Sequence, residues 1–86
     1  MSYYFEHYGG KDMQIYKNLG GNSNIVAYSI GENYIDVQFR DNSIYRYSYG
    51  SAGVAKVEQM KKLAIQGVGL NSYIMRQVKR NYEFKY

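Results

Sequence analysis

Residues 34–47 read YIDVQFRDNSIYRY, and this stretch decides the fold. In its first half the side chains of Ile35, Val37 and Phe39 point one way, while polar side chains such as Asp36 point the other way. This alternation is typical of an antiparallel strand that buries one face and exposes the other. We therefore expect Asp36 to be a solvent-facing strand residue.

The length of the hairpin loop decides where the tyrosines lie. A two-residue loop would place Tyr45 and Tyr47 on the solvent face and would bury Arg46 on the apolar face. A three-residue loop over residues 40–42, with Asn42 in the left-handed conformation, places both tyrosines on the apolar face instead. We prefer the three-residue loop because the shorter one buries an arginine that has no visible partner.

Two helices are predicted after the hairpin, because apolar side chains recur there at helical spacing. Ser51 is the expected N-cap of the first helix, and Gly67 is its expected terminator. Asn71 or Ser72 is expected to cap the second helix, which would run to about Arg80. Its buried side is predicted to carry a set of four residues: Ile74, Met75, Val78 and Tyr82.

These elements predict an α+β fold, in which a three-stranded antiparallel β-meander is followed by two α-helices packed on one face. Residues 1–22 form an aromatic and glycine-rich segment, and residues 23–86 form the domain. The amino-terminal segment and the carboxy-terminal tail are candidates for further strands at the edges of this sheet. The three strands of the meander are predicted at residues 24–30, 34–40 and 43–49.

The composition argues against catalysis and against metal binding. The chain has 86 residues, which suffices for one domain, and it contains no cysteine and one histidine, His7. Catalytic arrangements of a nucleophile and a base that need a second imidazole or a thiol are therefore excluded. The Asp and Glu residues of the chain are isolated, and their spacing is not that of a metal-binding motif. We expect neither enzyme activity nor a cofactor or metal. No apolar stretch could span a bilayer and no signal peptide begins the chain, so a cytoplasmic location is expected.

The charge is concentrated in the last third of the chain. Residues 56–86 contain seven of the eleven Lys and Arg residues and only two acids, whereas residues 1–55 carry a net charge of −1. This asymmetry favours an anionic partner. The chain also has 12 tyrosines, whose rings either complete the edge of a thin core or serve as exposed contacts.

The candidate binding face lies on the second predicted helix. At ~100° per residue, Tyr73, Arg76 and Arg80 share one side of that helix, with Lys79 on its flank. Arginine makes bidentate phosphate contacts and tyrosine offers a stacking surface, although an ordinary solvated helix face is an equally good interpretation. Four further cations are expected to extend the basic surface: Arg46, Lys56, Lys61 and Lys62.

Several stretches resemble the KTSC domain family, which is named after its occurrence at the carboxy terminus of some lysyl-tRNA synthetases. The resemblance covers residues 23–82 and rests on the stretch from Ile35 to Tyr47, with its Tyr-x-Tyr, and on GLNSYI at residues 69–74. The chain departs from the family pattern in lacking a Val-Pro turn after Tyr47. The resemblance implies a divergent, stand-alone member and, by analogy, RNA binding.

The sequence thus supports a non-catalytic binding module for RNA or single-stranded DNA. The first alternative is a protein-interaction module, such as a small phage or mobile-element inhibitor that docks on a larger protein through exposed tyrosines. The second alternative is a structural or dimerising domain. No membrane partner is expected.

Overall fold

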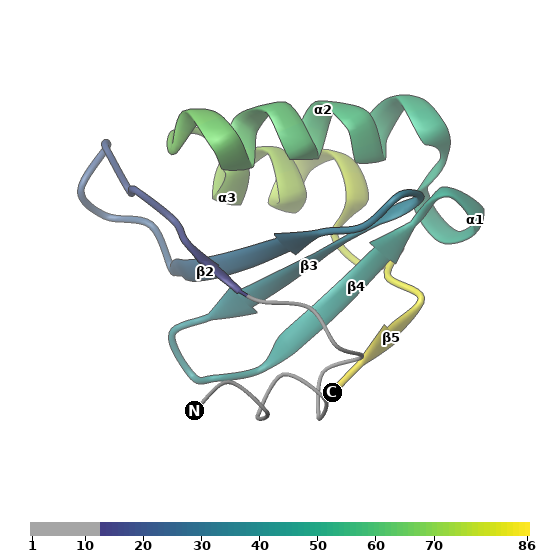
Figure 1. Ribbon diagram of the computed structural model, residues 1–86, viewed down its shortest axis with the longest axis horizontal. Coiled ribbons are helices and arrows are strands. Elements are labelled where there is room, and N and C mark those ends of the chain that lie inside the picture. Colours follow the sequence, from purple (N-terminus) through teal and green to yellow (C-terminus); the bar gives the residue numbers. More distant parts are fainter. Residues whose placement is uncertain (1–12) are drawn as a thin grey trace.

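The computed structural model describes residues 13–86 and has an α+β fold built on a five-stranded antiparallel sheet (Figure 1). The strands follow one another in space as they do in the chain, so the sheet is a simple meander. Their bounds are β1 (Gln14–Ile15), β2 (Ile25–Ile30), β3 (Tyr34–Phe39), β4 (Ile44–Ser48) and β5 (Phe84–Lys85). The short outer strands come from the amino-terminal segment and from the carboxy-terminal tail. His7 and the rest of residues 1–12 lie outside the described residues.

The two longer helical segments lie together on one face of the sheet, and a short helical turn stands at the end of β4 (Figure 1). α1 (Tyr49–Ala52) and α2 (Val54–Gln66) follow β4, and α3 (Leu70–Tyr73) continues into a π-helical turn, η2 (Ile74–Val78). In the described part of the chain, no helix is both long and apolar enough to cross a bilayer.

The central hairpin has the preferred three-residue loop. Val37 lies opposite Tyr45 and Ile35 lies opposite Tyr47, which puts both tyrosines on the face that the helices cover. Asn42 has a φ of 73°, and its backbone N–H donates to the carbonyl of Phe39. The left-handed position that the loop requires is thus occupied by asparagine, which tolerates this conformation well.

The core lies between the sheet and α2, α3 and η2. Tyr16 is also buried there, and its hydroxyl accepts a hydrogen bond from the N–H of Leu70, so part of the amino-terminal segment packs into the domain. Tyr47 is fully buried, whereas Tyr45 is only half-buried. The apolar cluster consists of Tyr16, Ile25, Ile35, Val37, Tyr47, Val57, Met60, Ala64, Leu70, Ile74 and Val78.

Both predicted helix starts were misplaced. The helix that ends at Gly67 is α2, and its N-cap is Gly53, not Ser51. Ser51 belongs to the preceding turn, α1, where it is the third helical residue and forms a reciprocal capping box with the N-cap, Ser48. The second helix begins after Gly69, which has a φ of 85°, so neither Asn71 nor Ser72 is its N-cap. A left-handed glycine can reverse the chain between two packed helices, and this need overrides the capping preference of Asn and Ser.

The second helix is also shorter and less buried than predicted. It ends at Val78, and Tyr82 lies beyond it with a side chain that is 38% exposed. Ile74 and Val78 are buried as expected, but Met75 is 50% exposed. The helix therefore buries a narrow stripe, and the aromatic side chains of β3 and β4 beside it stay partly uncovered.

Gly67 ends α2 and is tightly enclosed. Its φ is 81°, its carbonyl accepts a hydrogen bond from the N–H of Leu19, and an added Cβ would lie 2.6 Å from the Cβ of Lys17. A side chain at this position would be strained by its backbone angle and would also displace the segment that carries Lys17.

Gly67→Ala is therefore expected to lower the free energy of unfolding by about 2–4 kcal/mol, measured by urea denaturation. Gly21→Ala is the matched control, because Gly21 has a φ of 88° but nothing within 4 Å of an added Cβ. The control should lose only about 1–2 kcal/mol, the cost of the left-handed backbone. Equal losses would mean that the contact with Lys17 imposes no constraint.

Candidate functional site

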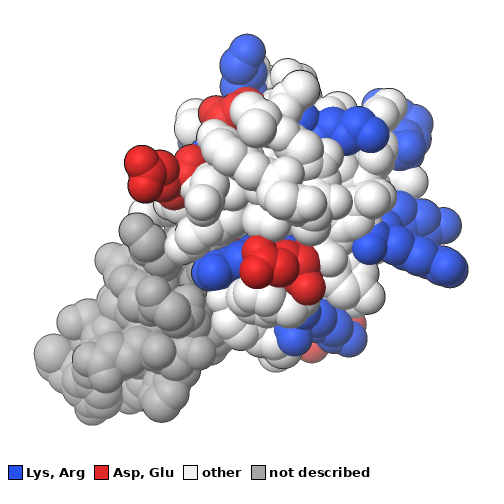
Figure 2. Space-filling view, turned by 90° about the vertical axis from the view of Figure 1, so that its right-hand side faces the viewer, with Lys and Arg blue, Asp and Glu red and all other residues white. Residues whose placement is uncertain are grey.

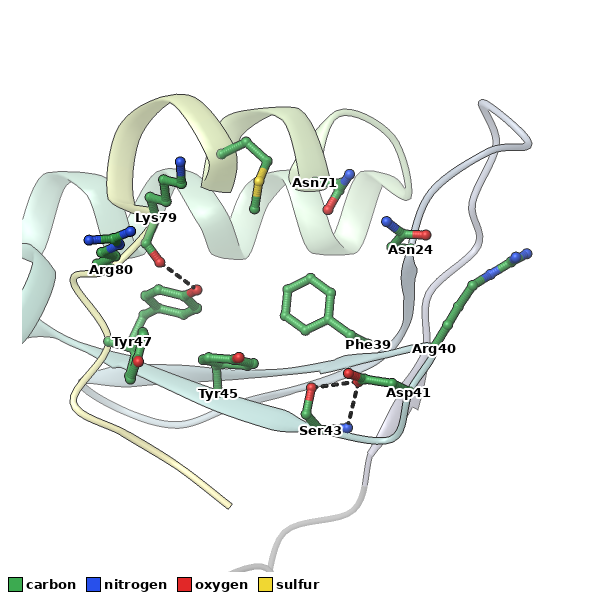
Figure 3. Close-up of a pocket in the computed structure, with 12 residues that line it drawn as sticks. Asn24, Phe39, Arg40, Asp41, Ser43, Tyr45, Tyr47, Asn71, Lys79 and Arg80 are labelled. Carbon is green, nitrogen blue, oxygen red and sulfur yellow. Dashed lines mark hydrogen bonds between the residues drawn. The ribbon is translucent and has the colours of Figure 1, made fainter.

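An open groove of about 550 Å³ runs between the end of the central hairpin and the second helix (Figure 3). Its aromatic side chains come from the helix-facing side of β3 and β4 and from the chain after η2, and Met75 lines it from the second helix. The register between β3 and β4 explains this placement. It puts aromatic residues of both strands on the same face of the sheet, in a region that the short second helix does not cover. The aromatic residues in the groove are Phe39, Tyr45, Tyr47 and Tyr82.

These rings pack edge to face. The ring centroids of Phe39 and Tyr45 are 5.5 Å apart at an interplanar angle of 89°, and those of Tyr45 and Tyr82 are 4.8 Å apart at 80°. Phe39 and Tyr45 are half-buried and Tyr82 is exposed, so ring surface remains open to the groove. Tyr47 forms the buried base; its hydroxyl donates to the carbonyl of Lys79 at 3.5 Å, and burial raises its pKa well above the ordinary value.

Two cations stand at one end of the groove. Lys79 and Arg80 are both exposed and both line it (Figure 3). The helix ends in a π-type turn in which the N–H of Lys79 donates to the carbonyl of Ile74, and Lys79 has a φ of 20°. This abrupt ending turns the chain back toward β4, which brings Arg80 and Tyr82 to the edge of the groove.

Two of the lysines that were predicted to contact a partner, Lys61 and Lys56, make hydrogen bonds within the domain. The Nζ of Lys61 lies 2.8 Å from Oε2 of Glu58 and donates to the carbonyl of Glu32, and its side chain is 12% exposed. The hydrogen bond from Lys61 lowers the pKa of Glu58, whose carboxylate also accepts a hydrogen bond from Tyr49. Lys56 is exposed, but its Nζ donates to the carbonyl of Gln77 at 3.2 Å.

Arg46 does not extend the basic surface, and Asp36 does not face solvent. The Nε of Arg46 donates to Oδ1 of Asp36 at 2.7 Å and its terminal nitrogen donates to Oδ2 at 3.0 Å. Asp36 is 1% exposed, because aromatic side chains close over the pair from the face opposite the helices. The guanidinium carbon lies 3.7 Å from the ring centroid of Tyr34 and 5.0 Å from that of Phe84. The hydrogen bond to Asp36 raises the pKa of Arg46.

The remaining predicted residues are divided between the surface and the core. Arg76 and Lys62 are exposed but do not line the groove, and Tyr73 is half-buried against the core. Figure 2 shows basic side chains mainly on one side of the visible face, with acidic side chains nearer its centre and opposite side. Of the eight residues predicted to bind a partner, Lys79 and Arg80 are the two that line the groove.

Sequence reasoning missed the aromatic part of the groove. A signal was present, because the preferred register already placed Phe39 and Tyr45 on one face. The missing information was the length of the second helix, which decides whether those rings are covered. A second hollow of about 670 Å³ beside Tyr34 and Glu83 is a weaker candidate, since its one cation, Arg46, is already paired.

Residues 13–86 contain no group of three or more His, Asp or Glu side chains that could hold a metal ion. Comparisons of the chain with known protein families, with curated proteins and with solved structures find no match. The case for a function therefore rests on the geometry of the groove.

Proposed function

We propose that this domain is a non-catalytic module that binds RNA or single-stranded DNA in the aromatic groove. The observation that carries the proposal is the run of edge-to-face rings, Phe39, Tyr45 and Tyr82, which opens into a groove with two exposed cations at one end. The contact surface differs from the one expected from sequence, because it combines hairpin rings with Lys79 and Arg80.

Stacking and charge together favour this ligand. Each base stacked on an aromatic side chain contributes about 1–3 kcal/mol to binding, and any base can provide the π-face. Lys79 and Arg80 would attract the phosphates, and neither makes an ion pair among the described residues. Duplex nucleic acid hides its base faces within the stack, so the groove should prefer a single strand.

The test is fluorescence anisotropy of the protein against labelled single-stranded RNA, single-stranded DNA and duplex DNA at about 50–200 mM salt. We expect micromolar binding to a single strand, weaker binding to the duplex, and an affinity that falls with salt because phosphate contacts release counterions. Weak binding to all three that disappears at physiological salt would contradict the proposal.

A protein-interaction role is the second candidate, and exposed apolar side chains favour it. Leu19 is 68% exposed and Val68 is 45% exposed, and the hydrogen bond from the N–H of Leu19 to the carbonyl of Gly67 brings them together. A partner that stays bound in high salt after nuclease treatment would support this role, and Leu19→Ser should then weaken its capture. The resemblance to the KTSC family stays a prediction and supports neither role.

A further inference from the structure

The two ends of the groove differ in chemistry. Lys79 and Arg80 stand at one end, whereas the other end is formed by neutral and acidic groups from three separate segments (Figure 3). Asn24 precedes β2, Asn71 lies on α3, and Asp41 belongs to the loop between β3 and β4. Arg40 also lies at this end, but its side chain points away from the groove (Figure 3).

Asp41 is a fixed hydrogen-bond acceptor. Its Oδ1 accepts hydrogen bonds from the hydroxyl of Ser43 at 2.6 Å and from the N–H of Ser43 at 3.0 Å. These hydrogen bonds lower the pKa of Asp41, so the carboxylate is ionised at neutral pH. Its Oδ2 has no partner among residues 13–86, and Lys85, whose charge also lowers the pKa of Asp41, makes no ion pair with it. Asp41 is exposed, so its Oδ2 is accessible to a hydrogen-bond donor on a ligand.

We infer that the groove holds one nucleotide in a fixed orientation, with its phosphate at Lys79 and Arg80 and a guanine base directed at Asp41. The inference rests on the proposed function and adds a base preference to it. A volume of about 550 Å³ lies within the range of roughly 300–1,000 Å³ that small-molecule sites occupy. The rings of Phe39 and Tyr45 lie between the two ends and provide the stacking surface for the base.

Guanine matches this end of the groove better than uracil does. Its Watson–Crick edge presents a ring N–H and an amino group side by side, both of them donors to a carboxylate, which can only accept. The corresponding edge of uracil has one N–H between two carbonyl oxygens, which an ionised carboxylate repels. The side-chain amides of Asn24 and Asn71 can rotate to donate to the guanine carbonyl, and they would not discriminate against it.

The experiment compares an oligouridine of about eight nucleotides with the same oligomer carrying a single central guanosine, by anisotropy on the full chain. We expect the guanosine oligomer to bind roughly ten-fold tighter, which is the low end of what a hydrogen bond to a charged group contributes. Asp41→Asn should remove this preference and leave the affinity for oligouridine unchanged or slightly higher. Glu83→Gln, which also removes one negative charge but lies outside the groove, should keep the preference.

The outcomes separate the inference from the function on which it rests. Equal affinities for the two oligomers, or a preference that persists in Asp41→Asn, would overturn the base assignment while single-strand binding stands. Failure of the wild-type protein to bind either oligomer would overturn both. Urea denaturation of Asp41→Asn verifies that the hairpin loop is intact, because the asparagine side chain can still accept from Ser43.

Discussion

Arg46→Met is expected to lower the free energy of unfolding by about 3–5 kcal/mol, because it leaves a buried carboxylate without its cation. Asp36 is 1% exposed, and Arg46 donates to both of its oxygens. Methionine retains much of the length and packing of the arginine stem, so the loss should reflect the unpaired charge and not a cavity. For a domain of this size such a loss is a large part of the total stability.

The tail over Asp36 would still supply one neutral donor. The hydroxyl of Tyr86 donates to Oδ2 of Asp36 at 3.1 Å and accepts from Arg46 at 3.0 Å. Burial and the nearby Asp36 carboxylate raise the pKa of Tyr86 to about 12, so its hydroxyl keeps its proton at neutral pH. A single neutral hydroxyl stabilises the Asp36 carboxylate much less than a bidentate guanidinium does, so the expected loss of unfolding free energy remains large.

Urea denaturation of three variants tests this account. Arg76→Met is the matched control: it makes the same chemical change at an exposed position and should stay within about 0.5 kcal/mol of wild type. Asp36→Leu combined with Arg46→Met removes both charges, and it should recover most of the loss because an apolar pair leaves no buried ion. A loss below about 1 kcal/mol for Arg46→Met alone would show that Asp36 is not held by this pair.

The central hairpin was predictable because its determinants are local. Alternation fixed the two faces of β3, and the cost of burying an unpartnered Arg46 selected the correct loop. The same reasoning failed for Asp36 because it considered each strand alone. The cross-strand neighbour of Asp36 is Arg46, and a cross-strand ion pair can be buried once another segment covers it. That segment contains Tyr86, which lies 50 residues further along the chain.

The candidate site depends even more on contacts that are distant in sequence. Its aromatic surface comes from the hairpin, and its cations follow the second helix. Helical periodicity placed Arg80 and Tyr73 on one face, but the helix stops at Val78, so Arg80 lies beyond it. Directly after the helix, the carbonyl of Lys79 accepts a hydrogen bond from the buried hydroxyl of Tyr47, which lies 32 residues earlier in the chain. No local pattern reports that contact.

Reversing the two groove cations, Lys79→Glu with Arg80→Glu, is expected to weaken single-strand binding by on the order of 100-fold or more. Each lost charge-assisted hydrogen bond costs about 1.5–3 kcal/mol, and repulsion between the new carboxylates and the phosphates adds to this. The plot of log affinity against log salt should also become shallower by roughly 1.4 units, since each phosphate contact to a single strand contributes about 0.7. Anisotropy at several salt concentrations measures both quantities.

A second double variant, Lys62→Glu with Arg76→Glu, separates the groove from the overall charge. Both double variants bring the formal net charge from +4 to zero, but Lys62 and Arg76 are exposed outside the groove. If the groove binds the strand, this variant should lose only the few-fold affinity that weaker long-range attraction explains. If both variants lose binding equally, net charge alone drives association and the groove assignment is wrong. Circular dichroism and urea denaturation of both variants ensure that the comparison is made between folded proteins.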